Sequence, residues 1–172
     1  MENTKKIAVL FKMVCEGYKG ADALGKKAAQ KIFYFFERAG LNLNLRYGIH
    51  YYGPYSAKLD DIMYELESEG YLTIDISQRT HVIHYGSENM SEDVLNAEER
   101  KIAEHILNIF GGKQPMELEA LSTMDYIMHS LLPATATDQD IISKFKQIKA
   151  TKFEQNVIDH TLLELKELKL TA

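Results

Sequence analysis

Apolar residues recur at intervals of three and four along most of this chain, which is the spacing that places them on one face of a helix. The first such set is formed by Ile7, Leu10, Phe11 and Val14. Helices are predicted over about 4–16, 26–39 and 56–69, and further helices over 95–172. The chain is therefore expected to be mainly α-helical, with sheet only where this spacing is lost.

The helical spacing is lost over Leu41–Tyr55, which is rich in aromatics and is expected to be a loop, and again over residues 71–86. Two segments rich in β-branched and aromatic residues, Tyr71–Ile76 and His81–Tyr85, flank a polar tetrapeptide and predict a β-hairpin over 71–86. Helix, helix, aromatic loop, helix and hairpin is the order of a winged helix, so residues 1–88 are predicted to be winged-helix-like. Residues 95–172 are predicted to form an all-α region packed on this half as one compact unit, because the connection is short.

Helix starts are marked by residues whose side chains can accept a backbone N–H. Ser56 is a candidate N-cap for the third helix. Asn96 with Glu99, and Thr137 with Asp140, have the spacing of reciprocal caps. These positions predict where three helices begin.

Charge argues against nucleic acid as a partner of the predicted winged helix. The 20 basic and 25 acidic residues give a net charge of −5. The helix that a winged fold usually lays into DNA, about 56–69, has Lys58 as its one basic residue and carries five acids. Such a helix would meet phosphates with the wrong sign, so DNA binding is disfavoured.

The chain shows no feature of a secreted or membrane protein. Cys15 is the only cysteine, so no intramolecular disulfide can form. The apolar run Ile7–Phe11 is too short for a signal peptide, and no run approaches the roughly 20 residues of a membrane span. A cytoplasmic protein without membrane contact is expected.

Motifs for catalysis, cofactors and metals are weak. Gly20–Lys26 has the spacing of a phosphate-binding loop, but Lys27 stands where a Ser or Thr would hold magnesium. The six histidines lack metal-site spacing, so no cofactor and no metal are expected. Asp125 and His129 lie four apart on a predicted helix and are an alternative acid–base pair.

Two groups of residues favour binding. Five ring-bearing residues lie beside the Gly53-Pro54 turn, where they offer a large contact area: Tyr47, His50, Tyr51, Tyr52 and Tyr55. Basic residues are expected on the outer side of the second helix and in the segment 141–153, and are the candidates for nucleic acid: Lys26, Lys27, Lys31, Arg38, Lys144, Lys146, Lys149 and Lys152.

The segment 25–75 resembles the bacterial YwgA family and is more distantly similar to the Panacea, or SocA-like, antitoxin-associated domain. The similarity lies in Lys27–Tyr34, in Tyr51–Ser56, and in Leu59 with Glu69–Leu72. The resemblance implies a small prokaryotic regulatory protein without a catalytic centre; the wider Panacea group neutralises toxins by direct contact. The motif residues carried over as candidate contacts are Gln30, Lys31, Tyr34, Tyr52, Gly53, Pro54 and Tyr55.

These observations together predict a non-catalytic regulatory protein that binds a protein partner such as a toxin, in an antitoxin-like or adaptor-like way. A winged-helix transcriptional regulator that binds DNA is the alternative. A homodimer through the leucine-rich last helix is a further expectation, from Leu162, Leu163, Leu165 and Leu168.

Overall fold

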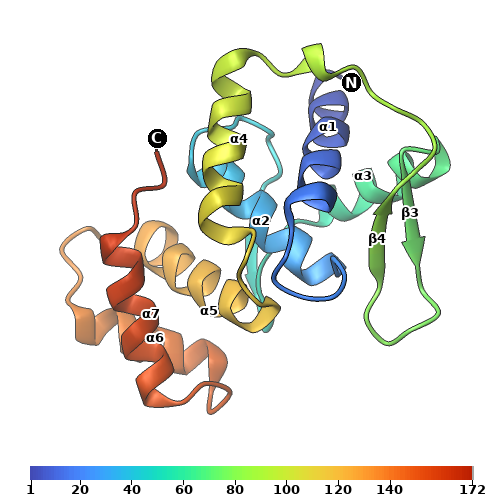
Figure 1. The fold of residues 1–172 in the computed structure, drawn as a ribbon. Helices are drawn as coiled ribbons and strands as arrows, with labels where there is room; N and C mark the ends of the chain where they lie inside the picture. Colours follow the sequence, from blue (N-terminus) through green and yellow to red (C-terminus); the bar gives the residue numbers. More distant parts are fainter. Residues whose placement is uncertain (172) are drawn as a thin grey trace.

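The computed structural model describes residues 1–171 and is mainly helical with two small antiparallel hairpins, as Figure 1 shows. The expected fold class, mainly α with a small β-hairpin, is confirmed. The elements are α1 (Glu2–Gly17), α2 (Lys26–Arg38), β1 (Gly48–His50), β2 (Gly53–Tyr55), α3 (Ala57–Ser68), β3 (Leu72–Asp75), β4 (Val82–Tyr85), η1 (Glu92–Val94), α4 (Ala97–Phe110), α5 (Pro115–Tyr126), η2 (Ile127–Leu131), α6 (Asp138–Lys149) and α7 (Gln155–Glu167).

The three predicted caps are present. Ser56 Oγ accepts a hydrogen bond from Leu59 N at 3.0 Å and so begins α3. Asn96 and Glu99 form a capping box at the start of α4, and Thr137 and Asp140 form one at the start of α6. In these three helices, a hydrogen bond between a side chain and the backbone three residues away fixes the first turn.

The predicted hairpin is β3–β4, in which Leu72 pairs with Tyr85 and Ile74 with Ile83. It extends from the body of the molecule on the side opposite α6 and α7 (Figure 1). A second hairpin, β1–β2, lies in the segment that was expected to be an aromatic loop. Its turn, Tyr51-Tyr52, leads into Gly53 at φ +96°, a value that favours glycine.

Helix α2 runs through the middle of the molecule and packs against α4, α5 and β2 (Figure 1). Its buried side includes Phe33 and Phe36, as predicted, and also Phe35, whose ring stacks on Phe110 at 3.8 Å. Every residue from Ala28 to Phe36 is buried. The expectation that Lys31 lies on the outer face is therefore wrong: β2 and α5 cover that side of the helix.

The C-terminal helices lie together on one side, where α7 packs against α5 and α6. Ile141, Phe145 and Ile158 are buried there, whereas Leu131, at the end of the π-helix η2, is exposed. Among residues 1–171, no helix is both long and apolar enough to cross a membrane.

Candidate functional site

The tip of the β1–β2 hairpin presents two exposed tyrosine rings. Tyr51 is 55% exposed and Tyr52 48%, and their rings meet edge to face with centroids 5.2 Å apart. Gly53 and Pro54, which follow, are buried between α2 and α5. The hairpin is thus anchored by its second strand, and its tip carries the rings to the surface.

Below this tip, two lysines from the end of α6 converge on one carboxylate of α5. Lys149 Nζ lies 2.6 Å from Glu119 Oε1 and also donates to the carbonyl of Tyr51. Lys152 Nζ lies 2.7 Å from the same carboxylate oxygen. Burial alone would raise the pKa of Glu119, but hydrogen bonds from Lys149 and Lys152 hold that pKa below its ordinary value. Glu119 is therefore an ionised carboxylate that ties α5 to α6 and to the hairpin tip.

A third lysine lies beneath the hairpin. Lys31 is 3% exposed, and its Nζ donates to the carbonyl of Pro54 at 2.7 Å. Burial lowers the pKa of Lys31 to about 7; Glu119 opposes this shift, while Lys149, Lys27 and Lys152 add to it.

A fourth lysine completes the cluster at the surface. Lys27 Nζ stands 3.6 Å from the centroid of the Tyr52 ring, and Lys152 Nζ stands 4.7 Å from the same centroid. We define the lysine–tyrosine site as the following residues: Lys27, Lys31, Tyr51, Tyr52, Glu119, Lys149 and Lys152. The site holds four lysines and one carboxylate, of which Lys149 and Lys152 contact that carboxylate directly, so basic groups outnumber acidic ones there although the whole chain is acidic.

A second polar cluster lies further along α2 and α5. Asp125, whose side chain is 4% exposed, accepts hydrogen bonds from Tyr34 Oη at 2.6 Å and from Arg38 Nε at 2.7 Å. His129 Nε2 lies 3.5 Å from the other carboxylate oxygen, and the imidazole side chain is 50% exposed. Burial and the neighbouring Asp125 raise the pKa of Tyr34 well above its ordinary value, so the phenol keeps its proton. The predicted Asp125–His129 pair is thus in place, with the carboxylate fixed from the side of α2.

The remaining aromatic and amide candidates have structural contacts. Gln30 is buried and exchanges two hydrogen bonds with the backbone of Ser56. Tyr47 Oη donates to the carbonyl of Gln30 at 2.7 Å. His50 is exposed, and its ring lies 5.0 Å from that of the half-buried Tyr55. Of the ring-bearing set, Tyr51, Tyr52 and His50 therefore face solvent most fully.

Some of the basic candidates are likewise held by contacts within the chain, and others face solvent. Lys26 pairs with Asp60 at 2.6 Å. Lys144 is half-buried and Lys146 is exposed on α6, whereas Lys149 is fully buried. The expectation that 141–153 is a solvated basic face is therefore wrong at Lys149, because α6 turns this side chain toward Glu119.

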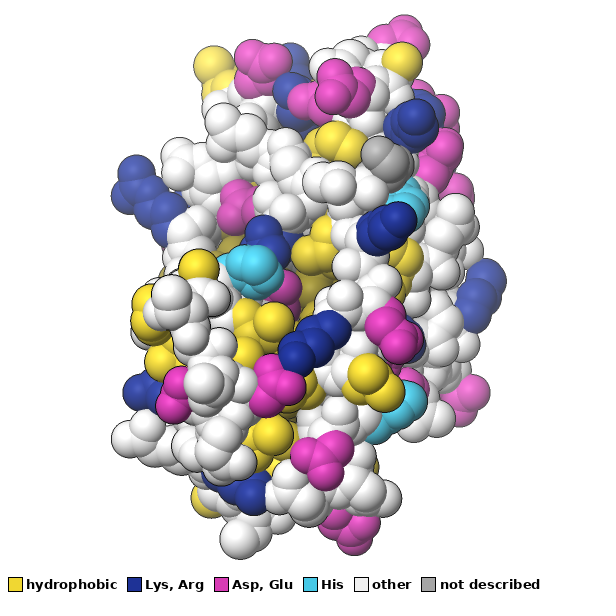
Figure 2. Space-filling view, turned by 90° about the vertical axis from the view of Figure 1, so that its left-hand side faces the viewer, with side chains coloured by type: hydrophobic (Ala, Val, Ile, Leu, Met, Phe, Trp, Pro, Cys, Tyr) yellow, Lys and Arg dark blue, Asp and Glu magenta, His cyan; other side chains and the backbone are white. Residues whose placement is uncertain are grey.

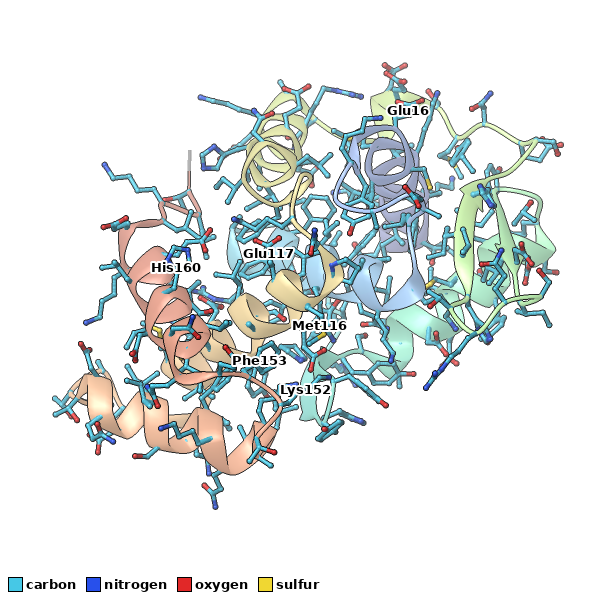
Figure 3. The ribbon with its side chains drawn as sticks, turned by 60° about the horizontal axis from the view of Figure 1, so that its bottom comes forward. Glu16, Met116, Glu117, Lys152, Phe153 and His160 are labelled. Atoms are coloured by element: carbon cyan, nitrogen blue, oxygen red, sulfur yellow. The ribbon has the colours of Figure 1, made fainter. Side chains whose placement is uncertain are left out.

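An apolar groove of about 300 Å³ runs between α5 and α7, next to the lysine–tyrosine site. Its walls include Met116, Leu121 and Phe153, and its edges carry Glu117 and Glu164. Figure 3 labels Lys152 beside Phe153, with Met116 and Glu117 on α5. The groove has acidic edges and so differs in charge from the neighbouring lysines.

Cys15 is half-buried near the end of α1. Burial raises the pKa of its thiol to about 11. The thiolate is therefore scarce at neutral pH, as expected for a cysteine that serves packing.

No family model matches the chain. The chain is similar to a DNA ADP-ribosyl glycohydrolase of Thermus aquaticus, with 29% identity over 154 residues. The matched region covers 84% of this chain and 42% of the relative, so the chain spans less than half of that protein's length. The resemblance to YwgA proteins is not addressed by this similarity and stays a prediction.

The similarity corrects two of the expectations drawn from the sequence. The prediction of a non-catalytic regulatory protein, with a transcriptional regulator as the alternative, is wrong, because the relative is an enzyme that hydrolyses a glycosidic bond. The expectation that the chain is not an enzyme is contradicted by the same finding. Both expectations rest on the family resemblance and on the absence of a familiar catalytic motif, and such motifs cover only part of known chemistry.

Proposed function

We propose that this chain takes part in hydrolysing ADP-ribosyl groups from DNA, and that the lysine–tyrosine site holds the modified nucleotide. The similarity to the Thermus enzyme supports the reaction. The observation that carries the assignment of the site is the surplus of lysine ammonium groups beside two exposed tyrosine rings. Ammonium groups attract phosphates, and aromatic rings stack on bases.

In this proposal, His129 is the residue that transfers the proton. Hydrolysis of a glycosidic bond needs a group that protonates the leaving group or removes a proton from water. His129 is half exposed, and Asp125 contacts its Nε2, so Nδ1 is the nitrogen that would face a substrate. Asp125 acts as a positioning residue, because Tyr34 and Arg38 hold its carboxylate in place.

The proposed substrate is attached to DNA, and this indicates where in the cell the protein works. In a prokaryotic cell, DNA lies in the cytoplasm, and the lone Cys15 agrees with a reducing compartment. We therefore propose that the protein works in the cytoplasm.

Release of ADP-ribose from an ADP-ribosylated oligonucleotide tests the proposal. The purified wild-type chain is expected to release ADP-ribose, and His129→Ala is expected to be slower by about 100-fold or more, which is the usual contribution of an acid–base group. His160→Ala is the matched control, because His160 is an exposed histidine that also lies four residues from a carboxylate, Glu164, at 3.9 Å. This control is expected to keep the wild-type rate.

The Thermus relative serves as the positive control in the same assay. Absence of release by the folded wild-type chain, under conditions in which the relative is active, would contradict the proposal. Equal rates in the wild type and His129→Ala would remove His129 from the mechanism.

A further inference from the structure

The four lysines of the lysine–tyrosine site differ in whether their ammonium groups are free to contact a ligand. Lys31 and Lys149 are buried and are held by the carbonyls of Pro54 and Tyr51. Lys27 is exposed, and among residues 1–171 it faces the Tyr52 ring and no carboxylate. Lys152 is half-buried and shares Glu119 with Lys149. The open part of the site is therefore two ammonium groups and two tyrosine rings, which lie above the buried side chains of Lys31, Lys149 and Glu119.

This positive region is small. Lys26, the neighbour of Lys27, is neutralised by Asp60. Helix α3 beyond it carries Asp61 and Glu65, and Glu69 is the residue that caps its C-terminal end. On the side of the molecule with α6 and α7, basic and acidic side chains are interspersed around a hydrophobic hollow (Figure 2). The surroundings therefore do not extend the positive charge along a track that a DNA strand could follow.

The geometry points to the nucleoside diphosphate part of the ADP-ribosyl group as the ligand of the lysine–tyrosine site. Its two phosphates would lie at Lys27 and Lys152, and its adenine would stack on Tyr52 or Tyr51. We name adenine because this inference rests on the proposed function. The site itself shows only that a ligand with an anionic group next to a flat aromatic ring would fit. In the part of the chain that the structure describes, the adjacent groove offers the phosphates no lysine or arginine: its lining includes Glu117 and Glu164, and the nearby Lys113 ammonium pairs with Glu164.

Calorimetric titration with four probes tests this inference without requiring any reaction. The probes are free ADP-ribose, ADP, adenosine and an unmodified single-stranded oligonucleotide. ADP-ribose and ADP are each expected to bind with a Kd at least tenfold lower than that of adenosine, and at least tenfold lower than that of the unmodified oligonucleotide. Tyr52→Ala is expected to weaken ADP binding about tenfold, and Tyr52→Phe to leave it within about twofold, since stacking needs only the ring.

Charge variants complete the test. Lys27→Gln is expected to weaken ADP binding about tenfold, whereas Lys146→Gln, the same change at an exposed lysine of α6, is expected to have no effect. Circular dichroism and thermal unfolding establish that each variant is folded. Failure of ADP-ribose and ADP to bind, unchanged binding in Tyr52→Ala and Lys27→Gln, or tighter binding of the unmodified oligonucleotide would each overturn the inference.

The experiments distinguish a failure of the proposed hydrolase activity from a failure of the proposed ligand site. ADP-ribose binding that depends on Tyr52, in a protein that releases no ADP-ribose from DNA, supports the site and contradicts the hydrolase. Release that is insensitive to Tyr52→Ala and Lys27→Gln supports the hydrolase and contradicts the site.

Discussion

Among single residues, Thr123 has an unusual environment. Its hydroxyl is fully buried between α5 and the hairpin and has no hydrogen-bond partner among residues 1–171. An unpaired buried hydroxyl costs free energy that an apolar group of similar shape does not. Thr123→Val is therefore expected to raise the free energy of unfolding by about 1 kcal/mol, measured by urea denaturation.

The neighbouring Ser122 supplies the contrast for that measurement. Ser122 Oγ donates to the carbonyl of Glu119 at 3.3 Å, so Ser122→Ala removes a hydrogen bond and is expected to lower stability by about 1 kcal/mol. A lower stability of Thr123→Val would show that the threonine hydroxyl is paired in solution.

Lys31 makes stability depend on pH. Its pKa is about 7 in the folded chain and 10.5 in the unfolded chain, so between these values the unfolded state binds the extra proton. The contribution of Lys31 to the free energy of unfolding is therefore expected to rise with pH over this window, by at most about 1.4 kcal/mol per pH unit. Burial lowers the pKa of Lys149 as well and acts in the same direction.

The difference between wild type and Lys31→Met isolates this contribution. Chemical denaturation at pH 7, 8, 9 and 10 is expected to give a difference that moves in favour of the wild type as pH rises, because the other groups titrate in both proteins. A difference that is constant from pH 7 to pH 10 would place the pKa of Lys31 near its ordinary value.

At the scale of elements, Glu119 links α5, α6 and the hairpin tip. Its carboxylate is the one acidic partner that Lys149 and Lys152 share among residues 1–171, and the Lys149 side chain is fully buried. Glu119→Gln leaves these charges uncompensated, so unfolding is expected to become easier by about 3 kcal/mol at pH 7. Since the pKa of Glu119 is lowered in the folded state, this difference is expected to shrink as pH falls below about 4.5. Thermal unfolding at pH 7 and pH 4 checks both statements.

Glu98→Gln is the control for that experiment, since Glu98 is exposed on α4. It is expected to change stability by less than about 0.5 kcal/mol. A similarly small effect of Glu119→Gln would mean that the lysines find other partners and that the link between the elements is weak.

Elements that depend on local interactions could be predicted from the sequence. The starts of α3, α4 and α6 follow from Ser56, Asn96 and Thr137, whose side chains bond within three residues. The β1–β2 hairpin was missed because its strands are three residues long. The two-residue spacing between His50 and Gly53 was the signal that could have identified it.

The candidate site could be predicted only in pieces. Tyr51 and Tyr52 belong to the predicted aromatic set, and Lys27, Lys149 and Lys152 belong to the predicted basic set, but the sequence offers no reason to bring the two sets together. That reason is Glu119, a single acid within the apolar sequence Leu118–Leu121, and it was not singled out. The burial of Lys31 likewise depends on α5, which lies some 90 positions further along the chain. Contacts between distant segments decide the site, and helical spacing does not report them.

For the whole molecule, the distribution of charge bears on the action on DNA that we propose. The net charge is −5, and α3 presents acids where a winged helix would meet the duplex. Phosphate contacts supply most of the non-sequence-specific affinity for DNA, so this arrangement disfavours binding to unmodified strands. Recognition would then depend on the modification and would leave the rest of the DNA free.

Neutralising the acids of α3 tests this argument. Asp61→Asn, Glu65→Gln and Glu69→Gln change three exposed carboxylates and move the net charge from −5 to −2. The triple variant is expected to retain unmodified duplex DNA in a filter-binding assay at 50 mM salt, with retention lost at 200 mM, because the affinity comes from released counterions. Glu67 is kept, since its carboxylate accepts a hydrogen bond from Ile74 N. Wild-type chain that binds unmodified duplex as well as the triple variant does would show that the acids of α3 lie away from the path of DNA.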